Sequence, residues 1–187
     1  MKSKIEKVKI DYKGREVTAH KLTVSSQIPM NINVAWKKVQ TSVLLEFITK
    51  GKITFKPVEG KFPEIWKQGH NVKTRMYLYG VIPFGGIHTL IFEKIDHRNR
   101  VIFSKEWDAS VKVWNHKISM INNGDSSIHY EDEIIIYGGL LTRIVSLWAS
   151  SFYKHRQKRW QLVAQDNGSQ EINANKKICS TKRTSHE

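Results

Sequence analysis

Four side chains that can hold or move a proton are candidates for a common site: His88, Glu106, His116 and Asp132. Imidazole and carboxylate groups act as general acids and bases when burial and neighbouring charges bring their pKa values near neutrality. The same groups can also fix the polar end of a bound molecule, ligate a metal, or satisfy one another in a buried hydrogen-bonded network. These roles stay open at the level of the sequence.

Several motifs that would specify a chemistry are absent from the sequence. There is no HExxH or CxxC spacing, which argues against a metal site, and no GxSxG nucleophile motif. The glycine pairs at 85–86 and 138–139 lack the spacings of phosphate-binding loops, and turn formation explains them. We therefore predict no cofactor and no metal.

The four titratable residues fall on a series of predicted β-strands. Runs rich in β-branched and aromatic residues alternate with short polar or glycine-containing turns, including Pro83–Gly86, Asp96–Arg100 and Asn122–Asp125. Strands joined only by tight turns are antiparallel neighbours, so the pattern predicts a meander. The expected strands are Val72–Ile82, Ile87–Ile95, Val101–Trp107, Ser110–Ile121 and Ser127–Tyr137.

The period of two along a strand indicates which residues share the apolar face. His116 shares a face with Trp114, Ile118 and Met120, and Asp132 shares one with Tyr130, Ile134 and Ile136. On the strands that carry His88 and Glu106 both faces are nearly equally apolar, so either face can be the inner one.

Helices flank the strands. A strand at Val17–Ile28 is followed by two expected short helices, Asn31–Gln40 and Ser42–Ile48, and the sheet proper begins at Ile53–Phe55. After Tyr137 the apolar spacing changes to three and four, which predicts a helix over Leu140–Ala164. Its apolar stripe is Ile144, Trp148 and Phe152. Such a helix spans about 37 Å at 1.5 Å per residue, enough to cover a curved sheet and leave a cavity beneath it.

This layout resembles the START-like superfamily, also called SRPBCC or Bet v 1-like, over residues Val17 to Gln165. Val34-Ala35-Trp36 resembles the strand-to-helix entry of the family. The segments that resemble a bacterial branch of it are Ile82–Gly85, Ser104–Glu106, Val113–His116, Tyr130–Glu133 and Phe152–Trp160. The resemblance implies an α+β helix-grip fold: a curved antiparallel sheet wrapped around a long C-terminal helix, with two short helices after the first strand. The superfamily contains lipid carriers, plant hormone receptors and aromatic polyketide cyclases, so the fold does not specify an activity.

The layout and the missing catalytic motifs favour binding or transport of a small, largely apolar ligand, such as a lipid, isoprenoid or polyketide-like molecule. The candidate ligand-binding residues are His88, Glu106, Trp114, His116, Tyr130, Asp132, Ile144, Trp148 and Phe152. The alternative from the enzyme class is a polyketide cyclase-like or dehydratase-type reaction that uses the histidines and carboxylates for proton transfer.

A third hypothesis comes from the charge. The chain has 31 Lys and Arg against 17 Asp and Glu, a formal net charge of +14. Lys154, Arg156, Lys158 and Arg159 near the end of the long helix can contact an anionic membrane or RNA, with Trp160 at the interface. The interpretation we favour is that they interact with the negative end of the helix and with solvent. Alternatively, Arg156 and Arg159 can pair with the acidic residues 131–133. No motif for specific DNA recognition is present.

The composition also suggests limits for the domain. We expect a basic N-terminal lead-in over 1–16, able to pair as an edge strand, a helix-grip domain over 17–165, and a polar flexible tail over 166–187. The single cysteine, Cys179, cannot form a disulfide within the chain, and no signal peptide or membrane-spanning run is apparent. The prediction is a cytoplasmic protein.

Overall fold

The computed structural model describes the backbone of residues 1–124 and 126–183, and the side chains of residues 1–124 and 126–166. Within these limits the chain forms an antiparallel sheet of eight strands in the order β1-β2-β8-β7-β6-β5-β4-β3. Each strand from β3 to β8 pairs with the next along the chain, which confirms the meander. The strands are β1 Lys2–Tyr12, β2 Arg15–Ile28, β3 Ile53–Pro57, β4 Asn71–Leu78, β5 Ile82–Asp96, β6 Val101–Trp107, β7 Val113–Asn122 and β8 Ile128–Tyr137.

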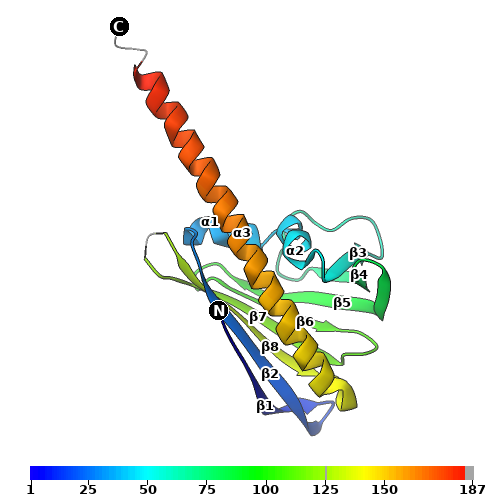
Figure 1. The fold of residues 1–187 in the computed structure, drawn as a ribbon. Coiled ribbons are helices and arrows are strands. Elements are labelled where there is room, and N and C mark those ends of the chain that lie inside the picture. Colours follow the sequence, from blue (N-terminus) through cyan, green and yellow to red (C-terminus); the bar gives the residue numbers. More distant parts are fainter. Residues whose placement is uncertain (125, 184–187) are drawn as a thin grey trace.

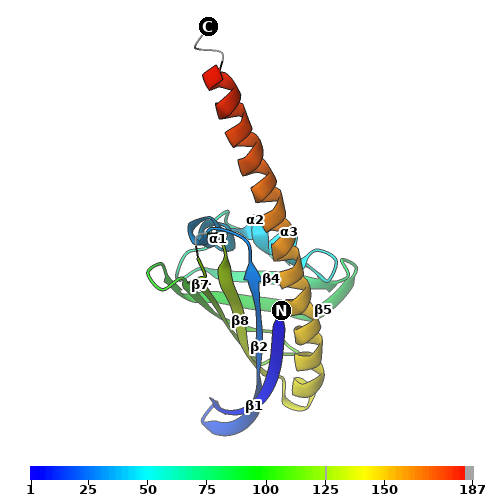
Figure 2. The ribbon, with the colours of Figure 1, turned by 60° about the vertical axis from the view of Figure 1, so that its left-hand side comes forward.

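A long C-terminal helix lies along the concave face of this sheet, and two short helices connect β2 to β3 (Figures 1 and 2). The sheet curves around the long helix, whose C-terminal part extends beyond the sheet. This arrangement confirms the α+β helix-grip fold. The helices are α1 Ile32–Val39, α2 Ser42–Thr49, the single 3₁₀ turn η1 Gly139–Leu141 and α3 Thr142–Arg183.

The two short helices begin where capping side chains allow it. Asn31 accepts a hydrogen bond from the backbone N–H of Asn33 at 2.9 Å, as the sequence indicated for the first helix. Thr41 does the same for the second helix, accepting from the N–H of Leu44 at 3.2 Å. The caps satisfy backbone donors at the helix starts and fix where the chain turns from β2 into the helical layer.

The basic lead-in is a full strand. Residues Lys2–Tyr12 pair with β2 along their whole length, and the turn at Lys13 and Gly14 has both residues at positive φ. The pairing expected of an edge strand is thus confirmed. It follows that the strand expected at Val17–Ile28 is the second of the sheet.

One predicted turn is wrong. Pro83–Gly86 lies inside β5, where Pro83 pairs with Tyr77 and Phe84 with Met76. The reversal between β4 and β5 occurs earlier, at Tyr79 and Gly80, which both have positive φ. Arg75 pairs with Ile87 and Met76 with Phe84, so the two glycines between them on β5 have no partner on β4 and form a bulge.

Helix α3 is longer than the apolar pattern predicted. It continues from Ala164, where the sequence analysis ended it, to Arg183. The proposed limits of the domain and the flexible character of 166–187 stay predictions, and residues 184–187 lie outside the part of the chain described.

The core divides into two apolar clusters between the sheet and the helices. One lies under α1 and α2 and includes Trp36, Ile48, Trp66, Tyr130 and Trp160. The other lies under the first turns of α3 and includes Leu22, Trp114, Ile134, Ala149 and Phe152. Side chains of both clusters line the cavity described next.

Candidate functional site

A cavity of about 280 Å³ lies between the concave face of the sheet and the helices. Its wall is formed by the inner faces of β3 to β7, by the segments that follow β3 and β6, by α1 and α2, and by residues 144–156 of α3. Most of this wall is apolar, and aromatic rings supply much of it: Phe55, Trp66, Phe92, Trp114, Trp148 and Phe152. Such a lining suits an apolar guest.

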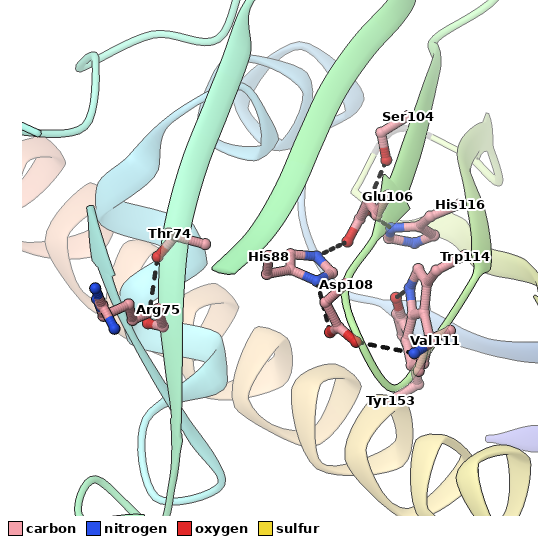
Figure 3. A network of polar contacts seen from close by, with 10 residues as sticks. All are labelled: Thr74, Arg75, His88, Ser104, Glu106, Asp108, Val111, Trp114, His116 and Tyr153. Carbon is pink, nitrogen blue, oxygen red and sulfur yellow. Dashed lines mark hydrogen bonds and ion pairs between the residues drawn. The ribbon is translucent and has the colours of Figure 1, made fainter. Parts of the chain in front are cut away.

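One side of the wall is polar, and its centre is His88. The imidazole lies between two carboxylates, with Nδ1 at 3.1 Å from Asp108 Oδ2 and Nε2 at 3.0 Å from Glu106 Oε2 (Figure 3). The Ser104 hydroxyl donates to the other oxygen of Glu106 at 2.8 Å. The His88 side chain is only 6% exposed and that of Glu106 15% exposed, and both line the cavity.

The strand register explains how these groups meet. Glu106 on β6 is paired with Leu90, so His88, two residues along β5, is its diagonal neighbour on the same face. Asp108 follows β6 and is held by the backbone N–H groups of Ser110 and Val111, at 2.7 and 2.8 Å from Oδ1. Its carboxylate is thereby directed at the ring of His88.

The carboxylates decide the protonation of His88. Burial alone would lower the pKa of His88, but the hydrogen bonds to Asp108 and Glu106 outweigh it and raise that pKa to about 9. Burial acts to raise the pKa of Glu106, and the hydrogen bond and charge of His88 outweigh it, so that this pKa is lowered. At neutral pH the pair is therefore an imidazolium with a carboxylate.

A second polar group lies beside the first, across β7 and β8. His116 Nε2 lies 2.9 Å from Asp132 Oδ1, and its Nδ1 lies 3.9 Å from Glu106 Oε1. Asp132 is completely buried and also accepts from Tyr130 Oη at 3.3 Å and from Gln157 Nε2 at 3.0 Å. Burial acts to raise the pKa of Asp132, but the Arg156 charge and the His116 and Gln157 hydrogen bonds lower it.

Arg156 of α3 completes the polar wall. It is 6% exposed, lines the cavity, and holds its guanidinium 4.7 Å from the centre of the Tyr153 ring. Burial acts to lower the pKa of Arg156, but the nearby Asp132 and the two buried tyrosines raise it, so the group stays charged. The Tyr153 hydroxyl accepts from Trp114 Nε1 at 3.2 Å.

The structure brings seven of the nine candidate residues to the cavity wall: His88, Glu106, Trp114, His116, Ile144, Trp148 and Phe152. Ile144 is 68% exposed and therefore lies at the rim. Tyr130 and Asp132 do not line the cavity. They are buried on the same face of β8. Asp132 is joined to the wall by its hydrogen bond with His116, and Tyr130 donates to Asp132.

Sequence reasoning did not identify five polar residues of the wall as ligand-binding candidates: Thr74, Ser104, Asp108, Tyr153 and Arg156. Arg156 carried a usable signal, because it lies four residues after Phe152 and eight after Trp148 and so continues their stripe. Asp108 carried none, since its position depends on the loop that follows β6.

The basic run on α3 needs correction. Arg156 and Trp160 are buried, the latter completely, so neither can lie at an interface with membrane or RNA. Arg159 is half-buried and donates from Nε to the carbonyl oxygen of Phe47 at 2.6 Å. Of the residues proposed for that contact, Lys154 and Lys158 are exposed. The long-range attraction of Arg156 is to Asp132, one of the acidic residues considered as its partner.

The described residues contain neither a metal-binding cluster nor a helix that could span a membrane. No group of three or more His, Cys, Asp or Glu side chains in the described part of the chain has an arrangement that would hold a metal ion. None of the helices there combines the length and the apolar character needed to span a membrane.

No sequence family and no curated protein sequence matches the chain. Solved structures do match. A START superfamily protein from Mycobacterium smegmatis is 10% identical with a TM-score of 0.56, and the match covers 78% of this chain and 97% of that one. Major latex-like protein 151 from Panax ginseng is 15% identical with a TM-score of 0.56 and the same coverages.

Norcoclaurine synthase from Thalictrum flavum, in complex with dopamine and hydroxybenzaldehyde, is 9% identical with a TM-score of 0.57. That match covers 79% of this chain and 87% of the synthase chain. These likenesses show that the chain has the START-like helix-grip fold expected from its sequence. At such identities they bear on the fold alone.

Proposed function

We propose that this protein binds a small, largely apolar molecule in the cavity between the sheet and α3. The observation that carries the proposal is the composition of the wall: aromatic and aliphatic side chains surround about 280 Å³, and polar groups gather on one side. Burying apolar surface of a ligand against such a wall is favourable, by about 25 cal/mol for each Å² removed from water. The polar side then fixes the orientation of the ligand.

The size of the cavity suggests a compact guest. Pockets for drug-sized ligands usually have volumes of about 300–1,000 Å³, and this cavity, at about 280 Å³, lies just below that range. A short lipid, an isoprenoid or a one- or two-ring polyketide-like molecule is small enough for a cavity of about 280 Å³. The norcoclaurine synthase of similar fold, solved with dopamine and hydroxybenzaldehyde, gives an example of single-ring guests in this architecture.

The polar groups support binding more than proton transfer. Both ring nitrogens of His88 are bound to carboxylates, and its raised pKa of about 9 leaves it protonated and a poor base at neutral pH. Glu106 is a weak base because its pKa is lowered. An acid–base enzyme therefore remains the second candidate, and Glu106 is the group that would contact its substrate. The cytoplasmic location expected from the sequence stays a prediction.

Native mass spectrometry of gently purified protein tests the proposal. We expect an added mass that leaves on denaturation, and that can be extracted and identified as an apolar compound. For protein that loses its ligand in purification, binding of the neutral fluorophore N-phenyl-1-naphthylamine is the second measurement. Absence of both a retained compound and saturable fluorophore binding would contradict a ligand-binding cavity.

A further inference from the structure

The cationic side chain of Arg156 lies at the cavity without the hydrogen bonds that a buried guanidinium requires. The residue is 6% exposed, and its Nε has no hydrogen-bond partner in the part of the chain described. Arginine carries five N–H donors and no acceptor, so burial without acceptors is costly. Its close neighbours are the rings of Tyr153 at 4.7 Å and Phe152 at 5.8 Å, which offer only cation–π contacts.

The carboxylate whose charge acts most strongly on Arg156 is Asp132, and it is already occupied by other donors. Asp132 accepts from His116 and Tyr130 on one oxygen and from Gln157 on the other. Its attraction for Arg156 acts at longer range and forms no contact within 4 Å in the described structure. Asp132 thus holds the charge of Arg156 in place while it leaves the guanidinium donors free for another acceptor.

We propose that Arg156 is the anchoring residue of the cavity, and that it donates hydrogen bonds to a carbonyl oxygen of an otherwise apolar ligand. The inference rests on the proposed function, since it concerns the ligand of the same cavity. It specifies the ligand class as an uncharged ketone or a related carbonyl compound.

The charges around Arg156 favour a neutral acceptor over an acid. Glu106, Asp108 and Asp132 bring three carboxylates to this side of the molecule, and the basic groups that face them are His88, His116 and Arg156. An anionic ligand would add a fourth negative charge in a region of low dielectric. A carbonyl oxygen accepts the same hydrogen bonds without adding that charge.

The ring-lined wall suggests the probes for a test. The compounds 2-acetonaphthone, 2-ethylnaphthalene and 2-naphthoate share one bicyclic ring and carry a ketone, no acceptor and a carboxylate, respectively. Their affinities for the full chain are measured by calorimetry or by displacement of N-phenyl-1-naphthylamine. We expect 2-acetonaphthone to bind about ten- to a hundredfold more tightly than 2-ethylnaphthalene. This ratio is the usual effect on affinity of one hydrogen bond to a charged group.

Substitution of Arg156 tests whether its N–H donors cause the tighter binding of 2-acetonaphthone. Arg156→Met is expected to reduce the affinity for 2-acetonaphthone to that for 2-ethylnaphthalene, with the affinity for 2-ethylnaphthalene nearly unchanged. Arg156→Lys, which keeps the charge, should retain part of the preference if Arg156→Met does not fold. Lys158→Met, which removes an exposed cation two residues along the same helix, is the matched control and should leave all three affinities unchanged.

Each alternative outcome is distinguishable. Equal binding of 2-acetonaphthone and 2-ethylnaphthalene by the wild-type protein would overturn the role of Arg156 and leave the binding cavity standing. Tighter binding of 2-naphthoate than of 2-acetonaphthone would overturn the neutral class in favour of an acid. Failure of all three probes and of the fluorophore to bind would overturn the proposed function itself.

Discussion

His88 Nε2 lies 3.0 Å from Glu106 Oε2, and the two side chains reach one another diagonally across neighbouring strands β5 and β6. The contact is enclosed, since neither side chain is more than 15% exposed. A protonated imidazole in this position is stabilised by a carboxylate that water screens only weakly. The stability of the fold therefore depends on the proton of His88.

We expect the free energy of unfolding to decrease as the pH rises from about 6.5 to about 9. The folded protein keeps the proton of His88 up to a pKa of about 9, whereas the unfolded chain loses it near the ordinary value of 6.5. Between these values the folded state binds one more proton, so stability falls by at most about 1.4 kcal/mol per pH unit. Urea unfolding at several pH values measures the slope.

The His88→Gln variant is the control for this pH dependence. Its side chain does not titrate, so the decrease between pH 6.5 and 9 should be absent from its unfolding curves. Identical slopes for the wild-type protein and the variant would show that His88 is not the group responsible.

The Gly85→Ala substitution should destabilise the fold by about 3 kcal/mol. Gly85 has φ +69°, and a Cβ there would lie 2.5 Å from Asp108 Oδ2, whose carboxylate is fixed by two backbone N–H groups. Positive φ costs a residue with a side chain about 1–2 kcal/mol, and a forced contact adds about 1–3 kcal/mol. Chemical unfolding at constant pH gives the difference.

Gly86→Ala is the matched control for Gly85→Ala. Gly86 has φ +72° and nothing within 4 Å of its added Cβ, so only the backbone cost of about 1–2 kcal/mol applies. If the two substitutions cost the same, the close approach of Asp108 to β5 would be contradicted.

The sequence predicted the sheet well where one face of a strand is more apolar than the other. On β7 and β8 the alternation indicated the inner face, and Trp114, His116, Tyr130 and Asp132 are all buried there. On β5 both faces are rich in apolar residues, and a register shift between Phe92 and Lys94 interrupts the alternation. Only the structure shows that the side chain of His88 faces inward.

The parts of the site that sequence reasoning missed depend on tertiary position. Asp108 follows a strand, and nothing in a local pattern indicates that its loop turns back to a histidine 20 residues earlier. Arg156 was interpreted as one of a run of basic residues, with an external partner, the helix terminus or the acidic residues 131–133 as its alternatives, and not as part of the cavity. Its position on the stripe of Trp148 and Phe152 determines its place in the cavity wall, because helical spacing, and not charge, decides which side of α3 faces the sheet.

Gln157→Leu should lower the free energy of unfolding by about 2–4 kcal/mol. Gln157 is fully buried, and its Nε2 donates to the Val24 carbonyl oxygen at 2.7 Å and to Asp132 Oδ2 at 3.0 Å. Leucine is of similar size but leaves two buried acceptors, one of them a carboxylate, without this donor. The exposed neighbour Lys158 provides the control, and Lys158→Leu should change stability by less than about 0.5 kcal/mol. Equal effects in urea unfolding would show that the bonds of Gln157 contribute nothing.

Leu90→Trp should weaken ligand binding while the protein still folds. Leu90 lines the cavity from β5, so a larger ring at this position occupies space that the ligand requires. Overpacking costs about 1–3 kcal/mol where there is no room, and the open cavity reduces that cost. Titration with N-phenyl-1-naphthylamine should show affinity weakened by about tenfold or more, which corresponds to at least 1.4 kcal/mol.

The neighbouring residue Ile91 gives the matched variant, because alternate residues of a strand point to opposite faces of the sheet. Ile91 is half-buried and does not line the cavity. Ile91→Trp adds the same ring to the outer face and should leave the affinity for the fluorophore unchanged. If both variants bind the fluorophore as the wild-type protein does, the ligand site lies outside this cavity. If both variants lose binding, the added ring disturbs the strand in general, and the loss in Leu90→Trp does not show that the ligand lies in the cavity.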